Sequence, residues 1–98
     1  MGFERHGQQR FTADGELGKT GESKMVLAIH IDSGATAGVV TLRNGTAVTD
    51  TIHVRESGNA NSGRTISFAP GFHFPAGCYV DVDANVTSVI VCYDEWAI

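Results

Sequence analysis

Residues 25–32 alternate between large apolar side chains and smaller or more polar ones. This period of two is typical of a strand that buries one face and exposes the other. The segment is therefore predicted to be a strand, and we expect the buried face to carry Met25, Leu27, Ile29 and Ile31.

A second strand is predicted over residues 37–43, directly before Asn44 and Gly45. Asn-Gly between two β patterns favours a two-residue hairpin turn, because that turn needs positive φ at both central positions. Residues 46–55 are accordingly predicted to be the return strand, with Ile52 and Val54 on one face.

Turn-forming residues fill residues 56–63, which we interpret as a flexible surface loop. Residues 64–69 then predict a short strand with Ile66 and Phe68 facing inward. Pro70-Gly71 predicts the next turn.

Residues 74–93 contain two runs rich in Val, Ile, Cys and Tyr around a polar break at residues 83–85. The pattern predicts a β-hairpin. A turn about Asn85 places Cys78 and Cys92 opposite each other, so a disulfide is geometrically conceivable. The alternative is that both are reduced, small apolar groups, which the lack of an apolar export segment favours.

Short strands separated by turns at near-regular intervals predict an all-β domain. About seven strands are expected, arranged as a small antiparallel β-sandwich or a jelly-roll-like barrel. Frequent Gly and the two Pro argue against any helix of useful length.

The first 24 residues differ from the rest in having five glycines, balanced charges and few large apolar groups. Such a composition buries too little apolar surface to offset its ordering entropy. We therefore expect residues 1–24 to form a flexible, extended N-terminal arm and residues 25–98 to form the β-sandwich domain. A body of this size is only marginally stable alone, which favours oligomerisation.

The formal net charge is −4, and it falls wholly on residues 25–98. Without a basic stripe, direct contact with nucleic acid is not expected. The sequence contains no apolar run of membrane-spanning length and no apolar segment near its start, so neither a membrane span nor a secretory signal is predicted.

The last strand carries apolar residues on both faces, which predicts that both faces are covered. One cover is the domain core, and the other is a neighbouring subunit or the arm. Trp96 either closes the core or anchors an interface. The residues expected at interfaces are Phe3, Phe11, Leu17, Val89, Val91, Tyr93 and Trp96.

The candidate catalytic and metal-binding residues do not form known motifs. His6, His30, His53 and His73 lack metal-ligand spacing, so no metal site or cofactor is predicted. We expect no enzymatic activity, since that would require His30 or His53 to meet an acid in a cleft.

Acidic residues allow one further alternative. Asp81 and Asp83 imitate the start of a calcium loop whose later positions fail, so solvated charges are expected there and a calcium ion shared between subunits is the alternative. Asp94 and Glu95 are adjacent and would point to opposite faces of a strand.

Residues 38–45 and 72–80, followed by residues 86–93, resemble short virion proteins of tailed bacteriophages. The resemblance covers most of residues 25–98. It implies a small β-sandwich on the particle, as a capsid decoration (cement) protein or a tail or fibre accessory, and it implies no catalytic residues.

These observations lead us to expect a capsid decoration protein in the virion, assembled in the host cytoplasm. Its expected partners are the major capsid protein and further copies of itself, with a trimer as the expected form. The alternative is a tail or fibre domain that binds a host-surface glycan through residues 56–63, Phe72, Phe74 and Tyr79. Exposure of Phe72 and Phe74 would favour the glycan-binding alternative.

Overall fold

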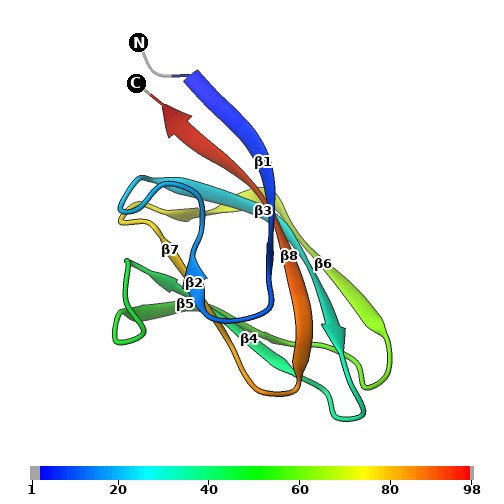
Figure 1. The fold of residues 1–98 in the computed structure, drawn as a ribbon. Helices are drawn as coiled ribbons and strands as arrows, with labels where there is room; N and C mark the ends of the chain where they lie inside the picture. The colour runs from blue at the N-terminus through cyan, green and yellow to red at the C-terminus, as the bar shows by residue number, and fades with distance from the viewer. Residues whose placement is uncertain (1–2, 98) are drawn as a thin grey trace.

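A computed structural model describes the backbone of residues 3–97 and the side chains of residues 7–95. This part of the chain is all-β, with eight strands and no helix, hence no helix that could span a membrane (Figure 1). The strands are β1 (Phe3–Phe11), β2 (Gly15–Glu16), β3 (Lys24–Ser33), β4 (Val39–Asn44), β5 (Thr51–Ser57), β6 (Gly63–Phe74), β7 (Cys78–Val82) and β8 (Val86–Ala97).

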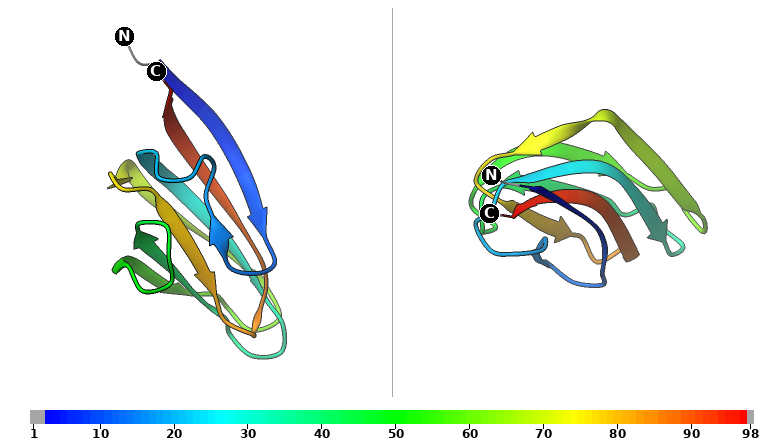
Figure 2. Two further views of the ribbon diagram at one scale, coloured as in Figure 1. Left: turned by 60° about the vertical axis from the view of Figure 1, so that its left-hand side comes forward. Right: turned by 90° about the horizontal axis from the view of Figure 1, so that it is seen from above.

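The strands form two antiparallel sheets of four, which confirms the predicted β-sandwich (Figure 2). The first sheet has the order β1-β8-β3-β6 and the second has the order β2-β7-β4-β5. Antiparallel pairs join β1 to β8, β2 to β7, β3 to β6 and β4 to β5. This nesting of first with last strand is the order of a jelly roll, one of the two architectures expected from the sequence.

The core lies between the two sheets and is built by the inward alternation of each strand. In β3 the inward set changes parity, because a register shift lies between Val26 and Ala28. Val26 is therefore buried before the shift, and Ile29 and Ile31 are buried after it. The uniform alternation expected over residues 25–32 is thus right for its second half. Met25 and Leu27 are only half-buried, because a bulge moves side chains from one face to the other.

The hairpin predicted over residues 74–93 is wrong. β7 belongs to the second sheet and β8 to the first, so the two strands pack across the core and do not share backbone hydrogen bonds. Cys78 and Val80 of β7, and Val89 and Val91 of β8, all point into the same core. Two strands in facing sheets bury one face each, just as two strands of a hairpin do. The alternation of apolar residues therefore could not distinguish the two arrangements.

The two-residue turn predicted at Asn44-Gly45 is also wrong, since β5 begins only at Thr51. Residues 45–50 form a longer loop. The Asp50 carboxylate accepts hydrogen bonds from the N–H groups of Thr46 and Ala47, at 2.9 Å each. Gly45 has φ +150°, and a Cβ there would collide with the Asp50 side chain. The loop is therefore closed by a side chain rather than by a tight backbone turn.

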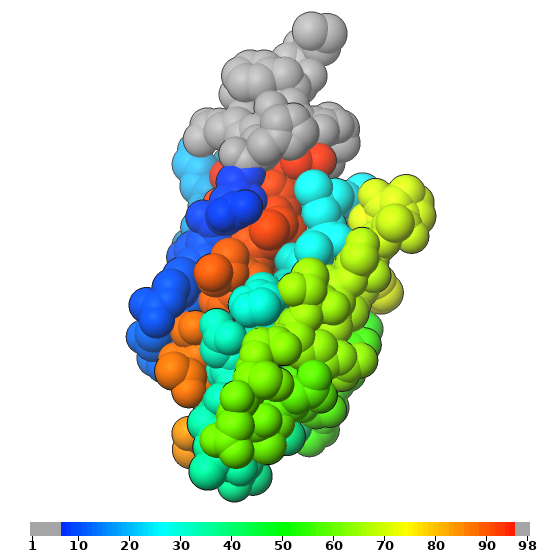
Figure 3. All heavy atoms as spheres, turned by 90° about the vertical axis from the view of Figure 1, so that its right-hand side faces the viewer, coloured from blue at the N-terminus to red at the C-terminus, as the bar shows by residue number. Residues whose placement is uncertain are grey.

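β6 contains the strand expected over residues 64–69 and continues well beyond it, to Phe74. Ile66 and Phe68 are partly buried against the core, as predicted. Pro70-Gly71 does not end the strand. It lies in a register shift, because Ser67 pairs with Ala28 and Phe72 is the next paired residue, opposite Val26. Figure 3 shows β6 at one edge of the first sheet, beyond β3 and β8.

The extended arm expected over residues 1–24 is not confirmed. Residues 3–11 form β1, the edge strand of the first sheet beside β8, and β2 joins the second sheet. Phe11 and Leu17 lie in the common core. The few apolar residues of this segment are spaced so that two of them reach the core, and strand pairing with β8 orders the polar residues between them.

Candidate functional site

Most of the predicted interface residues are core residues. Phe11, Leu17, Val89 and Val91 are buried in the single chain, which leaves no side-chain surface for a partner to contact. Tyr93 is half-buried and packs against the same core. The side chains of Phe3 and Trp96, like that of His6, lie outside the described part of the chain. These four residues therefore contribute to the core of the single chain, and the interface itself stays a prediction.

The exposed large apolar side chains lie elsewhere. Val48, Ile52 and Phe72 are 50%, 45% and 38% exposed. Val48 comes from the loop before β5, Ile52 from β5 and Phe72 from β6. The strands β5 and β6 are the edge strands that form one open side of the sandwich. We call this side the β5–β6 edge. The sequence pattern predicted that Ile52 and Val54 share one face of the strand. A register shift between Leu42 and Arg43 separates the two, and only Val54 is buried.

An aromatic cluster closes the β5–β6 edge. The His53 imidazole lies 5.8 Å from the Phe72 ring and 5.2 Å from the Phe74 ring, measured between centroids. Phe72 also contacts Phe74 at 5.5 Å and Phe68 at 6.4 Å. Nδ1 of His53 is buried and has no hydrogen-bond partner among the described residues. The cluster thus joins the two sheets by ring contacts and leaves one imidazole nitrogen unsatisfied.

Phe72 and Phe74 differ sharply in exposure. Phe74 is completely buried, as a structural core requires, whereas Phe72 presents part of its ring to solvent. Exposure of both rings would favour a glycan-binding domain, and burial of both would favour a decoration protein. The structure shows one exposed ring and one buried ring, so this criterion does not separate the two functions. Of these two rings, Phe72 is the one available as a stacking surface.

A buried ion pair joins the two central strands of the first sheet, β3 and β8. The Lys24 ammonium is 3.8 Å from the Glu95 carboxylate, and both side chains are buried. Nζ of Lys24 also donates to the carbonyl oxygens of Lys19 and Glu22, at 2.6 Å each. Desolvation lowers the pKa of Lys24, and Glu95 opposes that change by raising it.

The same ion pair holds the loop that connects β2 to β3. Oε2 of Glu95 accepts a hydrogen bond from the Lys19 N–H at 3.1 Å, and the Gln9 side chain accepts one from the Gly18 N–H at 2.8 Å. Gly18 has φ +58°, and a Cβ there would collide with Glu95. We call this set of contacts the polar latch. The sequence showed no sign of it, because a lysine beside a strand is usually a solvated residue.

A hydrogen-bonded row of polar side chains crosses the outer face of the first sheet. Nδ1 of His30 bonds to Oγ1 of Thr65 at 2.7 Å, and Nε2 of His30 lies 3.3 Å from Oδ1 of Asp32. His30 thus meets an acid, which the enzyme hypothesis required. However, His30 and Asp32 are each about two-fifths exposed on an open sheet face. Neither His30 nor Asp32 lines the cavity of about 500 Å³ that lies between the β1–β2 loop and the β7–β8 loop.

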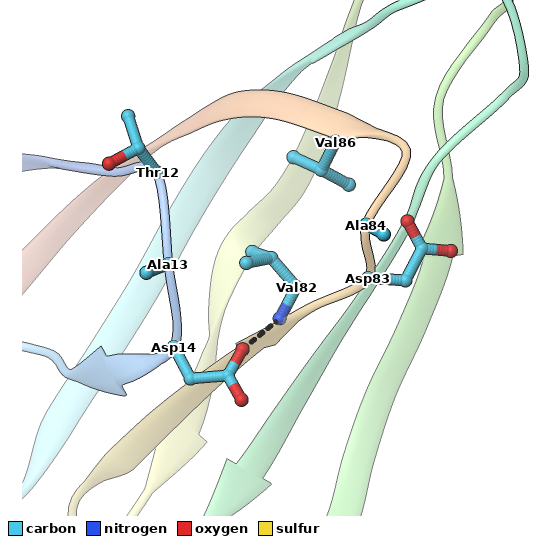
Figure 4. A pocket seen from close by; sticks show the side chains of 7 residues that line it. All are labelled: Thr12, Ala13, Asp14, Val82, Asp83, Ala84 and Val86. Atoms are coloured by element: carbon cyan, nitrogen blue, oxygen red, sulfur yellow. Dashed lines mark hydrogen bonds between the residues drawn. The ribbon is translucent and has the colours of Figure 1, made fainter.

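A cavity of about 500 Å³ lies between the β1–β2 loop and the β7–β8 loop (Figure 4). Asp14 borders it, and its carboxylate accepts a hydrogen bond from the Val82 N–H at 2.8 Å. The other residues that line the cavity are mostly small or apolar: Thr12, Ala13, Val82, Asp83, Ala84 and Val86. Asp14 therefore fastens one loop to β7.

The acids of the imitated calcium loop have separate partners. Asp81 forms an ion pair with Arg43 at 3.1 Å. Asp83 accepts a hydrogen bond from the Asn85 N–H at 2.9 Å, which stabilises the β7–β8 turn. Among the described residues, no group of three or more His, Cys, Asp or Glu side chains is arranged to hold a metal ion.

The two cysteines are free and belong to different sheets. Cys78 is buried in the core, and Cys92 is half-buried. The opposition that made a disulfide conceivable depended on the predicted hairpin and does not occur. Burial raises the pKa of the Cys78 thiol to about 12, against a smaller lowering effect of Lys24.

Comparison of the chain with protein-family models, with curated proteins and with solved structures found no match. The site is therefore interpreted from its own geometry.

Proposed function

We propose that this chain is a structural protein of a tailed-phage virion, a capsid decoration protein that attaches through the β5–β6 edge. The observation that supports attachment there is the exposure of Val48, Ile52 and Phe72, which belong to the loop before β5, to β5 and to β6. Large apolar side chains left exposed at the edge of a small domain are candidates for an interaction surface. The partner in this proposal is the major capsid protein of the same particle.

The architecture is compatible with this proposal by analogy. Eight-stranded jelly rolls occur in viral capsid proteins and in lectins, so the strand order agrees with both functions considered from the sequence. Fold alone does not assign function, whereas an exposed surface can be tested directly. A weak contact repeated over a symmetric shell is strengthened by avidity, and binding only the assembled lattice stabilises that lattice.

The proposal is tested on particles of a phage that encodes this chain. Particles without the protein are expected to assemble and adsorb to the host normally, but to lose resistance to heat or osmotic shock. Adding purified protein back should restore that resistance. Equal resistance with and without the protein would refute the proposal.

The attachment surface is tested with a matched pair of variants. Ile52→Asp places a charge on the β5–β6 edge, and Ala35→Asp places the same charge on an exposed loop between β3 and β4. We expect Ile52→Asp to lower occupancy on depleted shells and Ala35→Asp to leave it unchanged. Equal occupancy for both variants would exclude the β5–β6 edge as the attachment surface.

The second candidate function is a tail or fibre domain that binds a host-surface glycan. Its support is the partly exposed Phe72 ring beside the unsatisfied Nδ1 of His53, since sugar recognition combines an aromatic face with polar groups. In that case particles without the protein would adsorb poorly while the shell stays robust. Phe72→Ala would then abolish binding to glycans displayed on a surface.

A further inference from the structure

β1 is the one edge strand of the described fold that is both long and regular. It pairs with β8 from Phe3 to Phe11 without a register shift. The other three edges are interrupted or short: β6 has a register shift and Pro70, β5 has a register shift, and β2 has two residues. Proteins usually protect sheet edges by such interruptions, because an unprotected edge is a template for another strand.

The sequence of β1 is nearly symmetric about Gly7. It reads Phe-Glu-Arg-His-Gly-Gln-Gln-Arg-Phe from residue 3 to residue 11. Reversed about Gly7, Phe3 meets Phe11 and Glu4 meets Arg10. The remaining pairs combine a basic residue with glutamine, namely Arg5 with Gln9 and His6 with Gln8.

We propose that two copies of this chain pair through β1, antiparallel about a two-fold axis at Gly7. An axis perpendicular to the sheet keeps the outer face outward in both copies. Directly opposite residues must then lie on the same face, so the allowed registers differ by shifts of two residues of one strand along the other. The register centred on Gly7 is the one that pairs all nine residues, and it places Glu4 opposite Arg10 of the second copy. A register centred on His6 pairs histidine with itself, and one centred on Gln8 places His6 opposite Arg10.

Charge complementarity therefore selects the second copy as the occupant of this edge. The Glu4–Arg10 pair occurs twice by symmetry, and opposite charges facing each other across antiparallel strands stabilise the pair. Arg10 is exposed in the single chain, so its substitution leaves the core intact. The two first sheets then form one continuous eight-stranded sheet. This inference does not rest on attachment to a shell, and it replaces the expected trimer with a two-fold dimer.

The test is a charge exchange measured by analytical ultracentrifugation of the full chain. Wild type is expected to form dimers. Arg10→Glu places Glu4 opposite a second glutamate and should weaken the dimer at least tenfold, as should Glu4→Arg. The double variant Glu4→Arg/Arg10→Glu restores opposite charges and should recover the wild-type dissociation constant. Arg55→Glu is the matched control, because it makes the same charge change on the exposed face of β5 and should leave the dimer unchanged.

Circular dichroism of each variant separates loss of pairing from loss of folding. The inference is overturned if folded wild type stays monomeric at millimolar concentration. It is also overturned if Arg10→Glu and Arg55→Glu have equal effects, or if the double variant fails to recover pairing. None of these outcomes depends on whether the protein binds a capsid, so this test fails or succeeds separately from the proposed function.

Discussion

Two regions of this sandwich are closed by different chemistry. At one end of the first sheet, the Lys24–Glu95 pair joins β3 to β8, and its hydrogen bonds hold the loop between β2 and β3. On the side of β5 and β6, the rings of His53, Phe72 and Phe74 join the two sheets. The first closure is polar and buried, and the second is apolar and partly exposed.

The difference suggests two kinds of surface on one small domain. The β1 side offers a regular backbone edge, which another strand can extend by hydrogen bonds. The β5–β6 edge has its backbone regularity broken by bulges and Pro70, but it presents apolar side chains. We therefore expect strand pairing on one side and side-chain packing on the other, and the following experiments separate these expectations.

The largest effect is expected at the centre, between the two sides. Val91→Lys introduces a charge at a completely buried position. Burying an unpaired charge costs roughly several kcal/mol, which is comparable to the ~5–15 kcal/mol total stability of a typical domain. The variant should fail to fold by circular dichroism. Ile90→Lys is the matched control, since its half-buried side chain faces away from the core. Tolerance of Val91→Lys in a folded monomer would support the predicted place of this residue at an interface.

The polar latch is tested by removing one partner. Glu95→Ala leaves the Lys24 ammonium buried without its carboxylate, which typically lowers the free energy of unfolding by about 3–5 kcal/mol. The control is Glu56→Ala, because Glu56 pairs with Arg64 in a partly exposed ion pair at 3.9 Å. Exposed pairs contribute about 0–1 kcal/mol. Chemical denaturation of both variants should show this contrast, and equal losses would mean that the latch is no more than a surface pair.

Alkaline pH probes the core beside the latch. The pKa of Cys78 rises from 9.0 to about 12 on folding, so between these values the folded state binds more protons than the unfolded state. Stability should therefore fall as pH rises from 9 to 12, by up to about 4 kcal/mol for a pKa change of this size. Lys24 has the opposite sign. Its lowered pKa means that stability rises as pH increases toward 10.5.

Cys78→Ala isolates the cysteine contribution in denaturation curves measured at several pH values. It should lower stability modestly at neutral pH and remove the fall between pH 9 and 12. A fall of the same size in wild type and Cys78→Ala would assign the alkaline sensitivity to another group.

The smallest effect is expected on the aromatic side. Phe72→Ala removes a partly exposed ring whose contacts with neighbouring rings contribute about 1 kcal/mol. Phe74→Ala is the comparison, because deleting a fully buried ring costs about 3–5 kcal/mol. Thermal unfolding should rank the two in this order. If Phe72→Ala were as damaging as Phe74→Ala, Phe72 would be a core residue and the β5–β6 edge would lose its main contact.

Local pattern predicted several features of this protein. Alternation predicted the strands that became β3, β4 and the first half of β6, and the density of Gly and turn formers predicted the absence of helices in residues 3–97. The inward positions of Ile29, Ile31, Ile66 and Phe68 followed from the same period of two. These features depend on each residue and its neighbours in sequence, which is the information that a pattern contains.

Tertiary structure alone decided which strands pair. β7 and β8 carry alternation that suits a hairpin, yet they face each other across the core because β8 is placed between β1 and β3. The register shifts in β3 and β5 changed which side chains are buried, and no residue at those positions signals a bulge. The polar latch arose where Lys24 and Glu95, distant in sequence, met at one end of the first sheet. Sequence period fixes the two faces of a strand, but partner and register are set by the packing of the whole chain.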